Sequence, residues 1–237
     1  MVGLRPSMLS VSFIGEGALL SRAIKFSLEK KIKIDKIFLP ENNSFKKKPL
    51  PYNKNIIFFN RENLSDLLIN AMELNSCLFS INNKYIIEDI ALKRIKNVYN
   101  IHNGLVQRYR GLGEVCVFSA YLKQDIEYGA TLHIIEPNQG PDCGQIYAQK
   151  SFSLERPYKF QDIMTRSIIY CQKIFEENIL NILQGKRPIK KSEDKELGKI
   201  YTYKNIREII KNTKVTNMDL GVYEKDLMRI KKAIEKV

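Results

Sequence analysis

The sequence predicts an α/β protein built on a mostly parallel β-sheet that is flanked by helices. Short apolar runs rich in β-branched residues alternate along the chain with longer amphipathic stretches. The first apolar run leads directly into the turn Gly15-Glu16-Gly17, and strand, glycine turn and helix form the usual opening of such a sheet. Repeated alternation of this kind requires right-handed crossovers between parallel strands. With 237 residues, the chain can bury a sizeable core in one domain, with or without a small appendage.

The first half of the chain supplies five of the predicted strands, each a short apolar run: Met8–Ile14, Ile32–Leu39, Ile56–Phe59, Cys77–Ile81 and Val98–Ile101. Apolar residues at spacings of three and four predict helices over Leu19–Leu28, Leu64–Leu74 and Ile86–Ile95. The polar, proline-containing stretch Glu41–Asn55 predicts a surface loop. The glycine turn lacks the full GxGxxG pattern, so it is weak evidence for a dinucleotide site.

The second half of the chain predicts a short helix over Val115–Tyr121 and then two strands, Ala130–Ile135 and Gln145–Leu154, around a Pro/Gly-rich loop. A long amphipathic helix over Phe160–Leu183 follows and stops at Gly185. The charged stretch Gln184–Lys199 marks a boundary. We therefore predict a body over residues 1–185 and a basic C-terminal extension over 186–237, with short helices at Ile206–Lys211 and Glu224–Lys236.

The composition narrows the classes of partner. The hydrophobic and charged fractions, 44% and 27%, are those of an ordinary soluble protein. The formal net charge of +13 favours an anionic partner, although part of it reflects a lysine bias along the whole chain. The basic residues do not cluster with stacking aromatic residues, so we do not expect a nucleic-acid partner. A phosphorylated or nucleotide-linked small molecule fits the charge equally well.

Neither a membrane segment nor a metal site is expected. No apolar run approaches the ~20 residues of a membrane helix, and Met1–Ile14 lacks the features of a signal peptide; these points predict a cytoplasmic protein. The four cysteines are widely spaced without a CxxC pair, which argues against a zinc site or a disulfide framework. Cys143 could be a reactive thiol, but a small residue packed in a loop is the better interpretation.

The chemistry-bearing residues gather at strand ends. Asn100 and His102 lie at and just beyond the fifth strand, and Asp142 lies in the loop after the sixth. An amide donor, an imidazole and a carboxylate could together serve acyl transfer to an amine, which needs a stabilised oxyanion and a proton relay. A buried structural histidine remains the alternative for His102. For His133, in an alternating strand, a packed structural role is the better interpretation. Neither GxSxG nor a Walker loop occurs.

Three segments, NIHNGLVQRYRG, GATLH and PDCGQI, resemble in order the signature of the 10-formyltetrahydrofolate-dependent formyltransferases. That family's pattern is Asn-x-His-Pro-Ser-Leu-Leu-Pro-x-Tyr-x-Gly, then Gly-x-Thr/Ser-x-His, then Asp-x-Gly. The resemblance covers roughly Met8 to Gly185 and implies a Rossmann-like formyltransferase fold. The residues in step with the pattern are Asn100, His102, Leu105, Tyr109, Gly111, Gly129, Thr131, His133, Asp142 and Gly144.

The resemblance also implies the site residues. Asn100, His102 and Asp142 would be catalytic, and Thr131 would support them. The cofactor would be 10-formyltetrahydrofolate, released as tetrahydrofolate, with the pterin in a pocket near Ile86. The residues that would contact it are Ser80, Ile81, Asn82, Ile86, Glu136, Gln139, Gly140 and Asp142. This chain departs from the family pattern at Asn103–Gln107, in the EPNQGP loop and at Cys143, none of which removes a catalytic residue.

The acceptor amine is a separate question. Methionyl-tRNA formyltransferases add a C-terminal barrel that this chain has no room for, and the purine enzymes are little more than the body. A body with a short basic tail resembles the enzymes that formylate nucleotide-linked (dTDP-type) amino sugars for surface polysaccharide, such as lipopolysaccharide O-antigen. Arg108, Tyr109, Arg110 and Tyr201–Lys204 could then bind the substrate, against the alternative of a solvated basic surface. Several alternatives stay open. The acceptor could be an amino acid, a peptide or glycinamide ribonucleotide, or the enzyme could hydrolyse formyltetrahydrofolate. The fold could also bind a ligand without catalysis, and the tail could form a homodimer.

Overall fold

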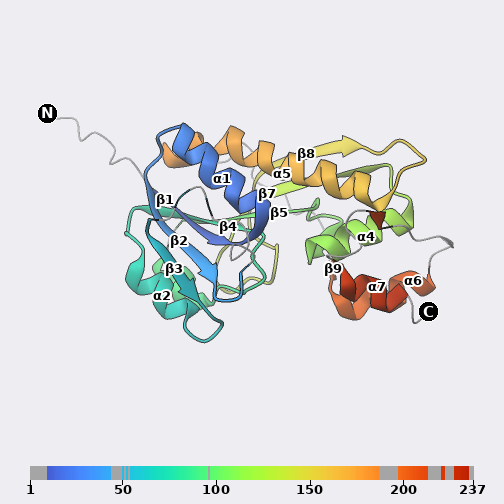
Figure 1. Ribbon diagram of the computed structural model, residues 1–237, viewed down its shortest axis with the longest axis horizontal. Helices are drawn as coiled ribbons and strands as arrows, with labels where there is room; N and C mark the ends of the chain where they lie inside the picture. The colour runs from blue at the N-terminus through green and yellow to red at the C-terminus, as the bar shows by residue number, and fades with distance from the viewer. Residues whose placement is uncertain are drawn as a thin grey trace, which may run out of the picture.

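The computed structural model describes residues 10–43, 50, 52, 54–95, 97–186, 197–212, 220–221 and 227–234. A seven-stranded sheet in the order β3-β2-β1-β4-β5-β7-β8 forms its centre (Figure 1). The first five strands in the chain are parallel, whereas β7 and β8 run antiparallel to their neighbours. The strands are β1 (Ser10–Gly15), β2 (Ile34–Pro40), β3 (Ile56–Phe59), β4 (Ser76–Ile81), β5 (Val98–His102), β7 (Glu127–Ile134) and β8 (Ile146–Ser153).

Two helices cover each face of the sheet. The α1 helix (Gly17–Glu29) and the long α5 helix (Phe160–Leu183) lie side by side on one face (Figure 1), and α2 (Leu64–Ala71) and α3 (Asp89–Arg94) lie on the other. On the first face Phe13, Phe79 and Phe175 are fully buried, with ring centroids 5.2 to 6.4 Å apart. Burial of aromatic side chains on this scale supplies much of the hydrophobic stabilisation of such a core.

The antiparallel pairing of β5 with β7 prepares the site. Asn100 lies opposite His133, and His102 lies opposite Thr131. Because side chains on paired strands point to the same side at matched positions, this register places two polar pairs on one stretch of the sheet. The sheet therefore brings together residues that are about thirty positions apart in sequence.

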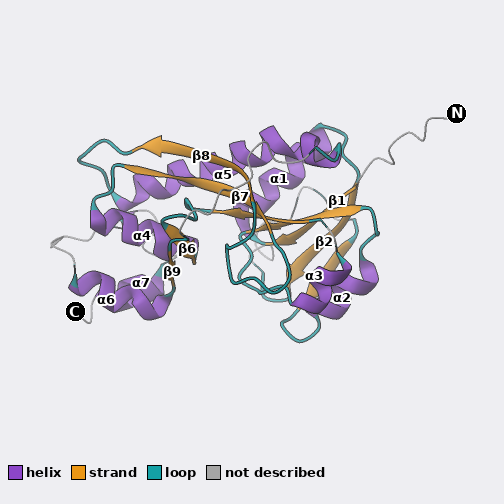
Figure 2. Ribbon diagram, turned by 180° about the vertical axis from the view of Figure 1, so that it is seen from behind, coloured by secondary structure: helices purple, strands orange, loops and turns teal. Residues whose placement is uncertain are grey.

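A second, smaller unit packs beside the end of the sheet. It combines the α4 helix (Gly113–Lys123) with the C-terminal helices α6 (Ile206–Lys211) and α7 (Met228–Ile234), which lie under α4 in Figure 2. A parallel two-stranded sheet joins β6 (Tyr109–Gly111) to β9 (Lys199–Tyr201). One continuous hydrophobic cluster links α4, the start of α5 and the C-terminal helices; its buried members include Phe118, Phe160, Tyr201, Ile206 and Ile230. The described part of the C-terminal extension is therefore folded onto the body.

The predicted fold class, a mostly parallel sheet flanked by helices, is confirmed. The helix predicted over Ile86–Ile95 is shorter, at Asp89–Arg94, and the strand predicted from Ala130 begins at Glu127. Residues 109–111, for which the sequence predicted no strand, form β6. Met8, parts of the Glu41–Asn55 loop, most of the charged boundary and the ends of the last predicted helix lie outside the described residues. None of the described helices is long and apolar enough to cross a membrane.

Candidate functional site

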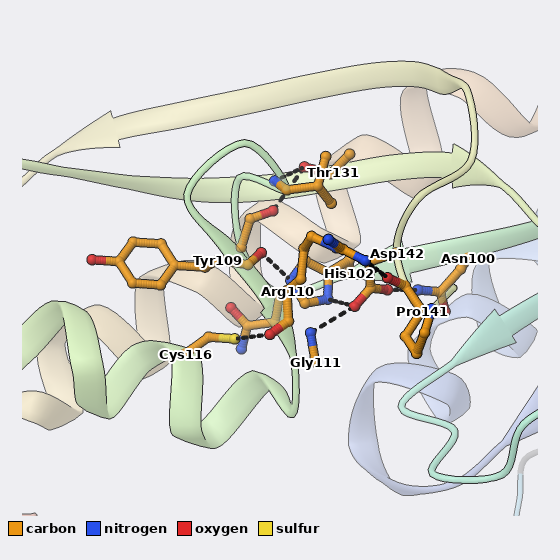
Figure 3. A network of polar contacts seen from close by, with 12 residues as sticks. Asn100, His102, Tyr109, Arg110, Gly111, Cys116, Thr131, Pro141 and Asp142 are labelled. Atoms are coloured by element: carbon orange, nitrogen blue, oxygen red, sulfur yellow. Dashed lines mark hydrogen bonds and ion pairs between the residues drawn. The ribbon is translucent and has the colours of Figure 1, made fainter. Parts of the chain in front are cut away.

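Asp142 is the centre of the candidate site. It follows β7 in the loop to β8, with a φ of 54° that places its carboxylate back over the sheet. Its Oδ1 accepts a hydrogen bond of 3.2 Å from Asn100 Nδ2, and its Oδ2 lies 3.5 Å from His102 Nδ1 (Figure 3). The three side chains that the sequence assigned to one site therefore do come together at the end of β5.

His133 joins the same cluster. Its Nε2 lies 3.0 Å from Asn100 Nδ2 and 3.2 Å from Asp142 Oδ1, while its Nδ1 lies 3.1 Å from the backbone oxygen of Ile134. Since a carbonyl can only accept, the tautomer with a proton on Nδ1 satisfies that contact and leaves Nε2 to accept from Asn100. The sequence interpretation left His133 out of the candidate set. Its place in the Gly-x-Thr-x-His segment, two residues after Thr131, was the available signal.

The carboxylate of Asp142 is held in its ionised form. Burial alone would raise the pKa of Asp142, but the nearby His102 and His133 rings and the Gly111 backbone N–H, which donates to Oδ2 at 2.7 Å, outweigh it. The net effect is a pKa of Asp142 well below its ordinary value. Charge-assisted hydrogen bonds of this kind favour the anion. A fixed negative charge therefore lies beside two imidazoles at neutral pH.

The imidazole of His102 is neutral but placed to gain a proton. Only 4% of the residue is exposed, and this burial lowers the pKa of His102 despite the opposing attraction of Asp142. Its Nε2 lies 2.9 Å from the backbone oxygen of Tyr109, so Nε2 carries the proton and donates. The lone pair of Nδ1 is then free to accept a proton on the side of Asp142. The resulting imidazolium would be stabilised by the carboxylate 3.5 Å away.

Thr131 supports the site through the backbone after His102. Its buried hydroxyl donates to the Gly104 oxygen at 2.7 Å and accepts from Gln149 Nε2 at 2.9 Å. Gln149 and Gln107 also bind each other through both amide groups, at 2.7 and 2.9 Å. Gln107 stands where the formyltransferase pattern has a proline. In this chain, hydrogen bonds between Gln107 and Gln149 therefore hold the loop that the proline of the family pattern would stiffen.

Replacing Thr131 by Val is expected to destabilise the fold by about 1–3 kcal/mol, because the buried Gly104 oxygen loses its donor. Equilibrium urea denaturation measures this free energy of unfolding. Thr131→Ser is the matched control: it keeps the hydroxyl and gives up only a methyl group, at a cost of about 0.8 kcal/mol. Equal unfolding free energies for the wild type and Thr131→Val would contradict this supporting role.

Arg108, Tyr109 and Arg110, the three residues predicted to bind substrate, differ in side-chain exposure and in their contacts with the protein. The side chain of Arg108 is 41% exposed, although it pairs with Asp125 at 2.9 Å. The Tyr109 side chain is buried with its hydroxyl on Asp125, and the Arg110 guanidinium is buried against backbone oxygens of Pro141 and Gly198. Figure 3 shows the Tyr109 ring directed away from the cluster. Substrate contact by Tyr109 and Arg110 stays a prediction, and in this structure both side chains bind protein groups.

An open depression of about 390 Å³ lies beside Arg108 rather than at the carboxylate cluster. Its walls come from the 105–108 loop and from the β7–β8 hairpin, through Leu105, Gln107, Arg108, Glu127, Gln149 and Ser151. None of these residues contacts Asp142 directly, but Gln149 connects the depression to Thr131. The depression therefore borders the site without containing its reactive groups.

The residues predicted to contact a cofactor fall on two neighbouring segments. Ser80 and Ile81 are buried in β4, and Asn82 follows them with a φ of 51° and binds the Glu16 oxygen at 3.1 Å. In the other segment Gln139 binds Glu136 at 3.0 Å, next to Gly140.

A contact of 3.0 Å from the Asn138 backbone N–H to Asp89 ties this second segment, the 136–142 loop, to α3. Ile86 is 76% exposed there, and Ile90, which sequence reasoning missed, is 63% exposed. Two large apolar side chains are therefore exposed close to the 136–142 loop.

Comparison with known proteins shows which solved structures share this fold. No protein-family model and no curated protein sequence matches the chain. Among solved structures, a 4-N formyltransferase from Francisella tularensis matches with a TM-score of 0.71 and 18% identity, over 96% of this chain and 86% of that one. An N-formyltransferase from Helicobacter canadensis, in complex with folinic acid and dTDP-3-aminofucose, matches with a TM-score of 0.64 and 18% identity, over 81% and 71%.

A purine-type enzyme has the same architecture. Glycinamide ribonucleotide transformylase 1 from Symbiobacterium toebii matches with a TM-score of 0.65 and 14% identity, over 84% of this chain and 98% of that one. Identities this low establish the fold and leave the reaction to be argued from the site. The chain therefore has the fold shared by the sugar N-formyltransferases and the glycinamide ribonucleotide formyltransferases.

Proposed function

We propose that this protein transfers a formyl group from 10-formyltetrahydrofolate to the amine of a nucleotide-linked, dTDP-type amino sugar. The observation that carries the proposal is the partly buried cluster of Asn100, His102 and Asp142, at the end of β5, in a fold shared with formyltransferases. Each member of the cluster has a chemical task in acyl transfer to nitrogen.

The three tasks follow from the geometry. Asp142 and His133 each accept one N–H of the Asn100 amide, and when substrate binds one of these N–H groups could turn to the oxygen on which negative charge develops. His102 presents an unprotonated Nδ1, so it could take the proton that the attacking amine loses. Asp142 would stabilise the imidazolium that results and hold the proton close to the leaving nitrogen. Burial of the cluster strengthens each of these interactions, because water does not screen them.

The residues present fit a reduced folate. When bound, the cofactor would supply the formyl group. Ile86 and Ile90 offer apolar contact for its ring system, and the backbone of the 136–142 loop offers polar groups beside them. The Helicobacter canadensis enzyme, which was crystallised with folinic acid, supports this assignment. Tetrahydrofolate would be the product.

Two observations favour a sugar acceptor. A match over 96% of this chain to the 4-N formyltransferase has to include most of residues 186–237, whereas the purine-type enzyme is covered almost completely and leaves part of this chain without a counterpart. The exposed cation of Arg108, at the rim of the open depression, suits a diphosphate. The product would enter surface polysaccharide. Folates and nucleotide sugars occur together in the cytoplasm, where we place the enzyme. We propose that it acts without a nucleic-acid or membrane partner.

A thermal-shift panel tests these assignments. Each ligand that binds only the folded state at 100 times its dissociation constant should stabilise the protein by about 2.7 kcal/mol. We expect a rise in Tm with folinic acid and with a dTDP-linked amino sugar, and a smaller rise or none with the UDP analogue and with glycinamide ribonucleotide. A response to glycinamide ribonucleotide, an amino acid or a peptide without one to any nucleotide sugar would refute the sugar assignment.

A further inference from the structure

We propose that the C-terminal segment, through residues 198–201, positions the catalytic groups of the body. It does so by holding β6, whose backbone contacts both His102 and Asp142. The catalytic role of these groups rests on the proposed function, whereas the contacts between the C-terminal segment, β6 and the cluster are independent of it. The C-terminal segment would then contribute to the geometry of the candidate site.

The β6 strand supplies one backbone group to His102 and one to Asp142. The Tyr109 oxygen accepts from His102 Nε2 at 2.9 Å, which fixes the tautomer of the imidazole. Two residues later, the Gly111 N–H donates to Asp142 Oδ2 at 2.7 Å, which helps to keep the carboxylate ionised. Figure 3 shows both contacts converging on the cluster. A shift of β6 would therefore disturb the imidazole and the carboxylate together.

The C-terminal segment is the strand partner of β6. Tyr109, Arg110 and Gly111 pair in register with Lys199, Ile200 and Tyr201, and no other described strand pairs with β6. Backbone hydrogen bonds continue past both ends of this small sheet: the Gly198 N–H donates to the Val106 oxygen at 3.0 Å, and the Leu112 N–H donates to the Tyr201 oxygen at 2.9 Å. Residues 106–112 therefore run alongside residues 198–201 and are hydrogen-bonded to them.

Side chains fasten β9 to the body. Tyr201 is buried, and its ring centroid lies 5.4 Å from that of Tyr109. Lys123 of α4 donates to the Tyr201 hydroxyl at 2.7 Å, and its ammonium lies 5.1 Å from the centroids of both rings. Cation–π and aromatic contacts of this kind stabilise the side chains that make them. The pairing of β6 with β9 is therefore packed as well as hydrogen-bonded.

Arg110 connects the C-terminal segment to the loop that carries Asp142. Its buried guanidinium donates to the Gly198 oxygen at 3.3 Å through Nη1, and to the Pro141 oxygen at 3.1 and 2.8 Å through Nε and Nη2. Pro141 directly precedes Asp142. One rigid, planar side chain thereby sets the spacing between the C-terminal segment and the catalytic carboxylate. Sequence reasoning treated this arginine as a substrate ligand, whereas its contacts indicate a positioning residue.

Gly198→Ala tests the inference because the changed residue lies in the C-terminal segment and outside the cluster. A Cβ at position 198 would overlap the Arg108 carbonyl group, with its oxygen only 2.7 Å away, so the two segments have to move apart. We expect kcat to fall about 100-fold, which is the cost of misplacing catalytic groups by roughly 1 Å. Gly185→Asn is the matched control: nothing lies within 4 Å of its Cβ, and asparagine tolerates the φ of +71° found there. It should keep wild-type kcat.

A second readout needs no substrate. The chain has only two histidines, so the ¹⁵N signals of His102 and His133 are readily separated, and His102→Asn assigns them. In the wild type we expect the Nε2–H tautomer at His102, and in Gly198→Ala a mixture with the Nδ1–H form. A change confined to global stability would leave this tautomer unaltered in the folded protein. Gly185→Asn should reproduce the wild-type spectrum.

The outcomes separate the two proposals. Wild-type tautomer and wild-type kcat in folded Gly198→Ala overturn the positioning role. If the His102 tautomer is altered in Gly198→Ala but the wild-type protein formylates no amino sugar, the positioning role is supported and the proposed function is contradicted. If Gly198→Ala does not fold, Arg110→Lys makes the same test, since a lysine cannot reach both the Gly198 and the Pro141 oxygens with the fixed fork of a guanidinium. An unchanged His102 tautomer in Arg110→Lys, with unchanged kcat, then overturns the inference.

Discussion

Replacing His102 by Asn is expected to lower kcat for formyl transfer by about 10²–10⁴-fold, the usual contribution of a positioned general acid or base. The variant keeps a polar side chain at a buried position but has no group that can take a proton at Nδ1. Steady-state kinetics with saturating folate and acceptor measure the loss. Circular dichroism and the Tm should show that the fold is retained.

His133→Gln is the comparison that makes this test specific. His133 is as buried as His102 and contacts the same carboxylate, but its Nδ1 is directed to the backbone oxygen of Ile134. We expect a smaller loss of kcat there, because this ring orients Asn100 without handling the proton. Equal losses in the two variants, or near-normal turnover in His102→Asn, would contradict the role of His102.

Asp142→Asn is expected to reduce kcat by a similar factor, about 10²–10⁴. The amide is nearly isosteric and can still accept from the Gly111 N–H, so the loop should keep its position. It cannot stabilise a positive charge on His102, and the proton uptake at Nδ1 becomes unfavourable. A loss below 10-fold, measured under the same saturating conditions, would show that the charge of Asp142 does not matter for the reaction.

The same variant has a predicted effect on acid stability. The pKa of Asp142 is lower in the folded protein than in the unfolded chain, so its ionisation stabilises the fold at neutral pH. This contribution is complete above the unfolded value of about 4 and is lost as the pH falls through the lowered folded value. The unfolding free energy of the wild type relative to Asp142→Asn should therefore decrease below about pH 4. A difference that does not vary with pH would contradict the assigned shift.

Much of the body could be predicted from the sequence because its signals are local. The strands β1 to β5 are short apolar runs, and in the described part of the chain a helix lies between each pair in succession except β2 and β3. The ordered segments around Asn100, Thr131 and Asp142 predicted the candidate site. Asn100, His102 and Asp142 do meet, as the ordered segments predicted. The expected reason, a common edge of parallel strands, does not hold for Asp142, because β7 runs antiparallel to β5.

What the sequence did not predict depends on such pairing. The β6 and β9 strands have three residues each and lie about ninety positions apart, so neither carries a periodic pattern of its own. His133 alternates with apolar neighbours as a packed residue would, and its register opposite Asn100, with its contacts to Asn100 and Asp142, shows that it enters the cluster. The charge of Arg110 predicted substrate contact, which stays a prediction, and the sequence did not predict its partners inside the protein, the backbone oxygens of Pro141 and Gly198 and the sulfur of Cys143.

The most direct test of the proposed activity follows the formyl carbon itself. The wild-type protein is mixed with 10-[¹³C]formyltetrahydrofolate and a dTDP-linked 4-amino or 3-amino dideoxy sugar, and ¹³C NMR records where the label goes, with Asp142→Asn as the inactive control. We predict that the label appears in a formamide on the sugar nitrogen in the wild-type reaction alone. Label that is released as formate without any acceptor, or that stays on the folate with every amino sugar, would contradict formyl transfer to a sugar amine.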